Sequence, residues 1–129
     1  SDVYKRQIHH GSYRHREGYK GAIALLQEGV TALIAGDSMM TAGALEACHN
    51  AGKRIGEEIA LVGFDDFIYL RFQPSPISVV DQDVARMGET ATAKLIAAIN
   101  EKHQPEGEVL ETRYIPRMST AHQLDGATP

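Results

Sequence analysis

The sequence has little of three features that would each have indicated a particular class of protein. It contains one cysteine, Cys48, in 129 residues, which excludes an internal disulfide framework and fits a reducing compartment. It has no apolar run long enough to cross a membrane. Its 13 lysines and arginines are scattered among 17 acidic residues, for a formal net charge of -4. Because binding to phosphates needs clustered basic side chains, we expect no nucleic-acid-binding surface on this chain.

The beginning of the chain shows no basic-then-apolar stretch of the secretory kind. Together with the single cysteine and the missing apolar run, this predicts a cytoplasmic protein with no membrane partner. Residues 1–7 have neither helical nor strand periodicity. We therefore leave residues 1–10 out of the fold, as an unpatterned segment that need not be native.

From residue 12 onward, the pattern predicts helices that alternate with short buried strands. Apolar residues at helical spacing predict one helix within 12–29 and a second within 37–52. Short continuous apolar runs at 31–36 and 59–64 are typical of strands buried on both faces, as in parallel sheets. The result is a strand–helix–strand unit.

The second half of the chain is less regular. A loop at 65–76 contains two prolines and leads into a short apolar segment at 77–80. A third helix is predicted at 83–100, followed by a charged spacer and a last strand at 109–115. On the predicted buried side of this helix lie Val84, Met87, Ala91, Leu95 and Ala98.

These elements predict an α/β fold with an open parallel sheet flanked by helices. They amount to only about two full strand–helix repeats, fewer than an open, doubly wound domain needs to cover both faces of its sheet. The pattern therefore indicates a part of a larger domain.

Acidic side chains follow two of the predicted strands. Asp37 comes directly after the strand at 31–36, and Asp65 comes directly after the strand at 59–64. Ligands of open α/β sheets bind outside the carboxyl ends of the strands, where carboxylates can accept hydrogen bonds from sugar hydroxyls. The alternative for each is local and compatible with binding: Asp37 caps the next helix, and Asp65 caps a turn.

Catalysis and metal binding have little support. Asp65 and Asp66 could instead hold magnesium, as in receiver domains. Such domains need an acidic pair early in the chain and a lysine after a later strand. Here the acidic pair comes late, and no lysine follows the segment at 77–80 at the required place. His9 and His10 lie in an unpatterned stretch, and the other four histidines lack i, i+4 partners. No serine or cysteine has the strand–turn–helix elbow of a hydrolase around it. We expect no enzyme, no cofactor and no metal.

Several spaced motifs resemble, in the right order, the signature of LacI/GalR transcription regulators. They are MMTAGAL at 39–45, AG at 51–52, IALVGFDD at 59–66, PSPISVVDQ at 74–82, MG at 87–88 and RMST at 117–120. The resemblance runs from about Gly11 to Thr120. It implies a partial periplasmic-binding-protein-like (type I) fold, in which two α/β subdomains close on a small ligand.

The resemblance also implies a function and a division of the chain. The chain would be the sugar- or nucleoside-sensing part of a dimeric repressor-type regulator, which contacts operator DNA only through a helix-turn-helix ahead of it. Residues 11–76 would belong to the C-terminal effector subdomain, residues 77–120 would form a crossover strand, a helix and a returning strand, and residues 121–129 would be a tail. The alternative is a periplasmic sugar-binding protein of the same fold, which the motif at 117–120 disfavours.

Four residues match effector-binding positions of the family. Asp65 matches the aspartate that contacts effector hydroxyls, and Gln82 matches a glutamine on the crossing segment. Tyr13 occupies the place of an aromatic that stacks on the ligand, or else packs onto its own helix. Asp37 falls where the family has asparagine, so an effector would have to offer hydroxyl or amine donors there. If the gap in the alignment with the family is placed differently, the family's asparagine position falls on Gly36, and Asp37 is left as a helix cap.

Overall fold

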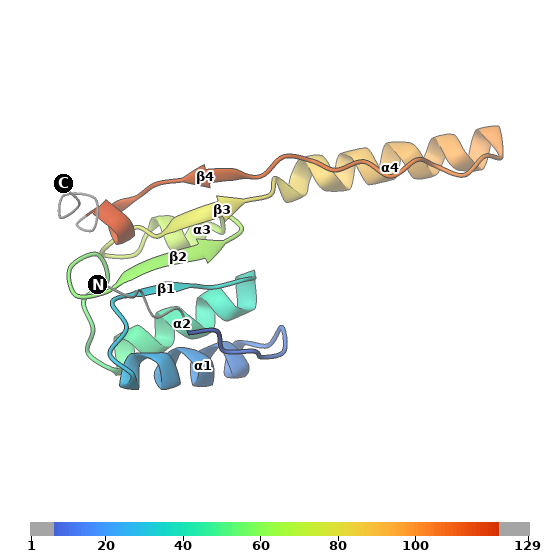
Figure 1. The fold of residues 1–129 in the computed structure, drawn as a ribbon. Coiled ribbons are helices and arrows are strands. Elements are labelled where there is room, and N and C mark those ends of the chain that lie inside the picture. The colour runs from blue at the N-terminus through green and yellow to red at the C-terminus, as the bar shows by residue number, and fades with distance from the viewer. Residues whose placement is uncertain (1–6, 122–129) are drawn as a thin grey trace, which may run out of the picture.

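The computed structural model describes residues 7–121 and contains a four-stranded sheet with helices packed against it (Figure 1). The strands lie in the order in which they occur along the chain. The first three are parallel, as expected, and the fourth is antiparallel to the third, which makes the sheet mixed. The strands are β1 (Ala32–Ile34), β2 (Ala60–Phe64), β3 (Ser78–Asp81) and β4 (Arg113–Ile115).

The three predicted helices are present. A short helix, α3, also forms in the segment that the sequence pattern predicted to be a loop. Within the described part of the chain, no helix is both long and apolar enough to span a membrane. The helices are α1 (His15–Gln27), α2 (Ser38–Asn50), α3 (Ile68–Arg71), α4 (Val84–Glu101) and the 3-10 helix η1 (Met118–Thr120).

The core lies around the central strand β2. Its apolar run is continuous because both faces are covered, and Leu61, its second residue, is fully buried. Leu70 brings α3 into the same core, which explains why so short a helix is stable there. Cys48 of α2 is also fully buried, and this burial raises the pKa of its thiol to about 11. Cys48 therefore acts as a small apolar residue.

Glycines allow α1 and α2 to pack closely. A Cβ atom at Gly18 would lie 2.6 Å from the Cα atom of Met40, and one at Gly43 would lie 2.5 Å from the backbone nitrogen of Tyr19. Larger residues at these positions would push the two helices apart. The close packing fixes the start of α2, and so fixes the end of β1 that leads into it.

The long helix α4 projects away from the rest of the fold (Figure 1). Asp83 caps it by accepting a hydrogen bond from the Arg86 backbone nitrogen at 3.1 Å. All of its residues are described, and none is buried; Leu95 on its predicted buried side is 59% exposed. The spacing correctly predicted the helix, but the side it predicted to be buried is open. The last strand is likewise shorter than predicted, and Val109 before it is 97% exposed.

Candidate functional site

Asp37 and Asp65 lie at one rim of the sheet, where β1 and β2 end. The two strands are parallel with Ile34 opposite Val62, and the Ala35 backbone nitrogen still donates to the Val62 oxygen at 2.9 Å. Asp37 follows the end of β1 by three residues and Asp65 follows the end of β2 by one, so both lie at this end of the sheet. Two of the four predicted site residues therefore lie at the same end of the sheet.

Thr41 connects the two strand ends. Its hydroxyl donates to the Asp37 carbonyl oxygen at 2.6 Å and accepts from the Phe64 backbone nitrogen at 3.0 Å. The side chain is fully buried, and a Cβ atom at Gly63 would lie only 2.5 Å from its methyl group. Sequence reasoning missed this residue. A threonine four residues after a capping aspartate predicts only the bond to the backbone carbonyl, not the bond to β2.

Asp37 caps α2, as the local alternative predicted. Its Oδ1 atom accepts from the Met40 backbone nitrogen at 2.7 Å. Its Oδ2 atom is buried and has no hydrogen-bond partner within residues 7–121. The cap therefore uses one carboxylate oxygen, and the described residues supply no donor to the other.

Asp65 has the left-handed backbone conformation, with φ of 63°, which aspartate tolerates better than most residues. Its backbone nitrogen donates to the Val80 oxygen at 2.9 Å, which fixes the residue against β3. Its Oδ1 atom is buried and, like Oδ2 of Asp37, finds no partner in the described part of the chain. Leaving a buried acceptor unsatisfied costs about 1–3 kcal/mol or more. Each aspartate thus keeps one buried carboxylate oxygen to which the described residues supply no hydrogen-bond donor.

The next residue, Asp66, has a different role. Arg117 binds it with two nitrogens, at 2.7 and 2.9 Å, and Arg71 adds a third bond at 2.8 Å. The hydrogen bonds from Arg117, together with those from Arg71, hold the pKa of the Asp66 carboxyl below its usual value. Because both oxygens are occupied, Asp66 is not free to bind magnesium beside Asp65. No group of three or more potential metal ligands occurs among the described residues.

The RMST motif at 117–120 attaches the end of the chain to the sheet. The Ser119 hydroxyl donates to the Leu61 oxygen at 2.6 Å and accepts from the Ser78 backbone nitrogen at 2.8 Å. The Ser78 hydroxyl in turn accepts from the Arg117 backbone nitrogen at 2.8 Å. The motif therefore has a structural role, positioning Arg117 for its bonds to Asp66.

Gln82 and Tyr13 complete the predicted set. Gln82 directly follows β3, which is parallel to β2, so it lies at the same end of the sheet as the two aspartates. Tyr13 precedes α1 and is 83% exposed, so it does not pack onto its own helix as the local alternative required. The start of α1 lies at the same end of the molecule as the tip of β2 (Figure 1). The two aspartates, Gln82 and the start of α1 thus lie at one end of the molecule.

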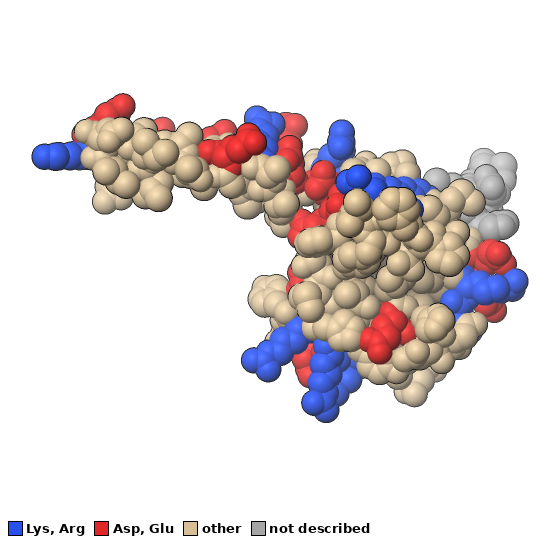
Figure 2. All heavy atoms as spheres, turned by 180° about the vertical axis from the view of Figure 1, so that it is seen from behind, with Lys and Arg blue, Asp and Glu red and all other residues tan. Residues whose placement is uncertain are grey.

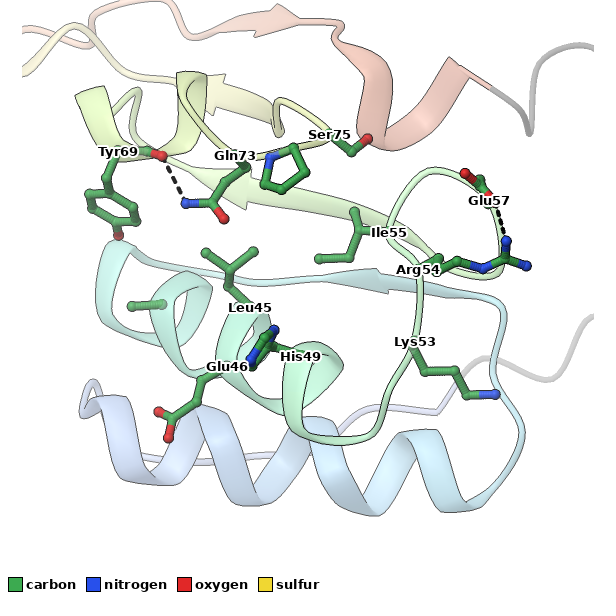
Figure 3. Close-up of a pocket in the computed structure, with 12 residues that line it drawn as sticks. Leu45, Glu46, His49, Lys53, Arg54, Ile55, Glu57, Tyr69, Gln73 and Ser75 are labelled. Carbon is green, nitrogen blue, oxygen red and sulfur yellow. Dashed lines mark hydrogen bonds and ion pairs between the residues drawn. The ribbon is translucent and has the colours of Figure 1, made fainter.

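Two hollows are found among the described residues, and neither is lined by the two aspartates. One, of about 550 Å³, lies between α2, the 53–57 loop and the 69–75 segment. In Figure 3, Leu45 and Ile55 form its apolar floor, and Arg54 pairs with Glu57 at its edge at 2.8 Å. The second, of about 1190 Å³, lies beside β1 and α1. We therefore base the candidate site on the unpartnered carboxylate oxygens rather than on hollow volume.

Comparison with families of known sequence gives a match over residues 3–120 to the periplasmic binding protein-like domain. The HTH-type transcriptional regulator reg1 of Streptomyces lividans is 31% identical over 94% of this chain and 35% of its own length. The HTH-type transcriptional regulator MalR of Streptomyces coelicolor is 31% identical over 92% of this chain and, again, 35% of its own length. The chain thus spans about a third of the length of these relatives.

Solved structures give the same result. A probable LacI family transcriptional regulator from Corynebacterium glutamicum has a TM-score of 0.76 at 35% identity, over 91% of this chain and 42% of its own. The regulator CelR in complex with cellobiose has a TM-score of 0.73 at 27% identity, over 84% and 34%. A lac repressor dimer bound to operator and an anti-inducer has a TM-score of 0.71 at 25% identity, over 85% and 34%.

Proposed function

The chain belongs to the periplasmic binding protein-like domain family, in its LacI/GalR branch, and we propose that it is the effector-sensing part of a transcription regulator. The observation that carries the proposal is the pair of buried, unpartnered carboxylate oxygens on Asp37 and Asp65. In this branch, a solved neighbour holds cellobiose. We propose a sugar or a nucleoside as the effector, because both present the hydroxyl donors that two carboxylates require.

Each of the four site residues has a separate task. Asp65 accepts a hydrogen bond from one hydroxyl of the effector, and Asp37 accepts from a second donor while it caps α2. Gln82, which both donates and accepts, reaches the effector from the strand that leads into α4. Tyr13 offers its exposed ring to the C–H face of the effector. These residues hold a ligand and perform no reaction.

The sensing mechanism follows from the position of Gln82 between the sheet and α4. The rim is one wall, and we propose that a second subdomain, packed against the exposed side of α4, supplies the other. An effector that binds both walls favours the closed arrangement, and this shifts the equilibrium between two domain orientations. In a cytoplasmic homodimer, that shift changes the spacing of two helix-turn-helix heads outside this chain, and so changes operator affinity.

Effector binding by the full-length regulator tests the proposal. Isothermal titration with cellobiose, glucose, glucosamine and adenosine should give saturable binding with at least one of them. Asp65→Ala should weaken that binding about 100-fold, as expected when a buried partner of a ligand hydroxyl is lost. Glu57→Gln is the matched control because Glu57 is an exposed carboxylate near the opposite end of β2. Equal affinity of the Asp65→Ala and control variants would refute the assignment of the site.

A further inference from the structure

We propose that the outer edge of β1 is a slot for one further apolar strand of the same sheet, supplied by the part of the regulator that precedes this chain. The hollow of about 1190 Å³ beside β1 and α1 is the space that this strand fills. The inference concerns an interaction surface and its partner, and it goes beyond the binding of an effector.

The first argument is the hydrogen-bonding capacity of this edge. Among the described residues, β1 is the outermost strand of the sheet and pairs with β2 alone. The Ala35 nitrogen and the Thr31 oxygen each bind β2 at 2.9 Å. Because backbone groups alternate in direction along a strand, the N–H and C=O groups of Ala32 and Ile34 point away from β2. These two residues therefore offer two donors and two acceptors to a strand on the other side.

The second argument is a contrast between the two edges of the sheet. β4, at the opposite edge, begins with the charged Arg113 and is followed by Pro116, and both residue types discourage pairing with another strand. The segment 31–36 has no charge and no proline, and its apolar run is typical of an interior strand. Ile34 is nevertheless 80% exposed. β1 thus combines the composition of an interior strand with the position of an edge strand.

The third argument is the hollow that borders this edge. It is lined by residues 30–35, by residues 7–9 and by α1. A Cβ atom at Gly21 would lie 2.5 Å from the ring of His9, so residues 7–9 pack directly on α1. No backbone hydrogen bond joins residues 7–9 to β1 in the described part of the chain. The apolar lining includes Ala22, Leu25, Val30, Leu33 and Ala44. Such a lining favours an apolar occupant.

The course of the chain selects the occupant. Residues 7–9 line the hollow, so the chain enters the described part of the molecule beside the slot. At the other end of that part, Ser119 binds Leu61 of β2 and Ser78 of β3, away from β1. The chain spans 35% of the length of its relative reg1, which leaves ample sequence outside it for a further strand. We therefore assign the slot to the preceding part of the regulator.

A strand in the slot also accounts for the exposure of Ile34. Side chains alternate along a strand, so Leu33 lies on one face, in the core with Ala22 of α1 and Ala44 of α2, and Ile34 lies on the other. A strand parallel to β1 needs a crossover connection of about a dozen residues or more, usually a helix. Placed on the open face of the sheet, that helix covers Ile34.

Amide hydrogen exchange of this chain and of the full-length regulator tests the proposal. With the strand in place, the outward amides of Ala32 and Ile34 should exchange about 100-fold more slowly in the full-length regulator than in this chain, relative to the amide of Ala35. Ala35 is the internal reference because its N–H already binds Val62. Fragmentation mass spectrometry resolves the single residues. An unchanged relative rate would overturn the proposal.

The variant Ala32→Pro gives an independent measurement. Proline lacks the N–H group, which costs little at an open edge but breaks a ladder hydrogen bond inside a sheet. The variant should lower the Tm of the full-length regulator by about 5 °C or more, and that of this chain by less than about 2 °C. Ala32→Gly keeps the N–H group and is the matched control, with a similar small loss expected in both proteins. Equal losses from Ala32→Pro in the two proteins would contradict the proposal.

The same experiments identify the rival occupant. If the Ala32 and Ile34 amides of this chain alone exchange slowly, and more slowly as its concentration rises, a second copy of the chain occupies the edge and the proposal is wrong. Neither measurement uses an effector. A negative result would therefore leave the proposed sensing function in place, and failure of effector binding would leave the strand slot in place.

Discussion

The body of this chain and its arm contain similar helices with opposite surroundings. The body is the sheet with α1, α2, α3 and η1, and the arm is α4 with residues 102–112. The 13 residues of α2 include five that are buried, whereas the 18 residues of α4 include none. Figure 2 shows the arm projecting from the rounded body, with its charged side chains along one edge and uncharged surface along the other. Amphipathic spacing thus specifies which side of a helix needs a partner, but does not supply that partner.

The connection that runs back along α4 illustrates the same point. The Lys94 ammonium donates to the Glu106 carbonyl oxygen at 3.0 Å and pairs with Glu108 at 3.4 Å. These polar contacts attach the 102–112 segment to the helix without covering its apolar side. Exposed ion pairs of this kind contribute little to stability. The arm is therefore shaped by its own hydrogen bonds, and the body by its core.

The largest expected effect comes from truncating the same residue type in both regions. Leu61→Ala should lower the free energy of unfolding by about 2–5 kcal/mol, because it leaves a cavity in a filled core. Leu95→Ala should change it by less than about 0.5 kcal/mol, because Leu95 is 59% exposed. Urea unfolding followed by circular dichroism measures both. A large loss in Leu95→Ala would mean that the arm is packed in solution, and the contrast between regions would disappear.

Within the body, the two arginines that bind Asp66 can be compared by the loss of unfolding free energy that follows the replacement of each. Arg117→Met should cost about 2–4 kcal/mol, because it breaks two bonds to a carboxylate whose side chain is only 11% exposed. Arg71→Met should cost about 1 kcal/mol or less, since the Arg71 side chain is 52% exposed. Chemical denaturation of the two variants gives the values. Similar losses would indicate that the two arginines share the stabilisation equally.

Lowering the pH should gradually remove the contribution of the Asp66 carboxylate to the free energy of unfolding. The Arg117 and Arg71 bonds lower the folded-state pKa of Asp66, so its stabilisation is present above its unfolded pKa of about 3.9 and is lost as the pH falls through the folded value. The difference in unfolding free energy between wild type and Asp66→Asn should be greatest at neutral pH and should narrow in acid. Denaturation from neutral pH to about pH 2.5 measures this difference. A difference that does not change with pH would contradict the pairing.

Substitutions in the arm are expected to have the smallest effect on the free energy of unfolding. Their main effect should be on self-association of the chain. An open apolar side promotes self-association of this chain, so sedimentation velocity should show a concentration-dependent increase in size. Replacing Leu95 and Ile99 with lysine should remove that increase and change the unfolding free energy by less than about 0.5 kcal/mol for each. The substitution Arg16→Lys, at an exposed position of α1, serves as a control. A concentration-independent monomer of the unmodified chain would show that the arm is covered in some other way.

Much of the fold could be predicted because hydrophobic periodicity, and the residues that begin and end helices and strands, are local features of the sequence. The spacing of Tyr19, Ala22 and Leu26 gave α1, and the apolar run around Leu61 gave β2. The one-turn helix α3 was not predicted, because its stability depends on the burial of Leu70 among residues distant in sequence. The direction of β4 was not predicted either, because pairing is decided by the path of the returning chain. The division of the chain at residue 76 remains a prediction.

The candidate site divides in the same way. The sequence alone predicted that Asp37 and Asp65 follow strands that end at one rim, because continuous apolar runs indicate parallel strands, whose carboxyl ends meet at the same edge of a sheet. Only the tertiary structure decided that one oxygen of each is buried without a partner, while the adjacent Asp66 binds Arg71 and Arg117. The physical reason is distance along the chain: Arg117 lies 51 residues from Asp66. Whether an acidic side chain is neutralised depends on what folding brings beside it.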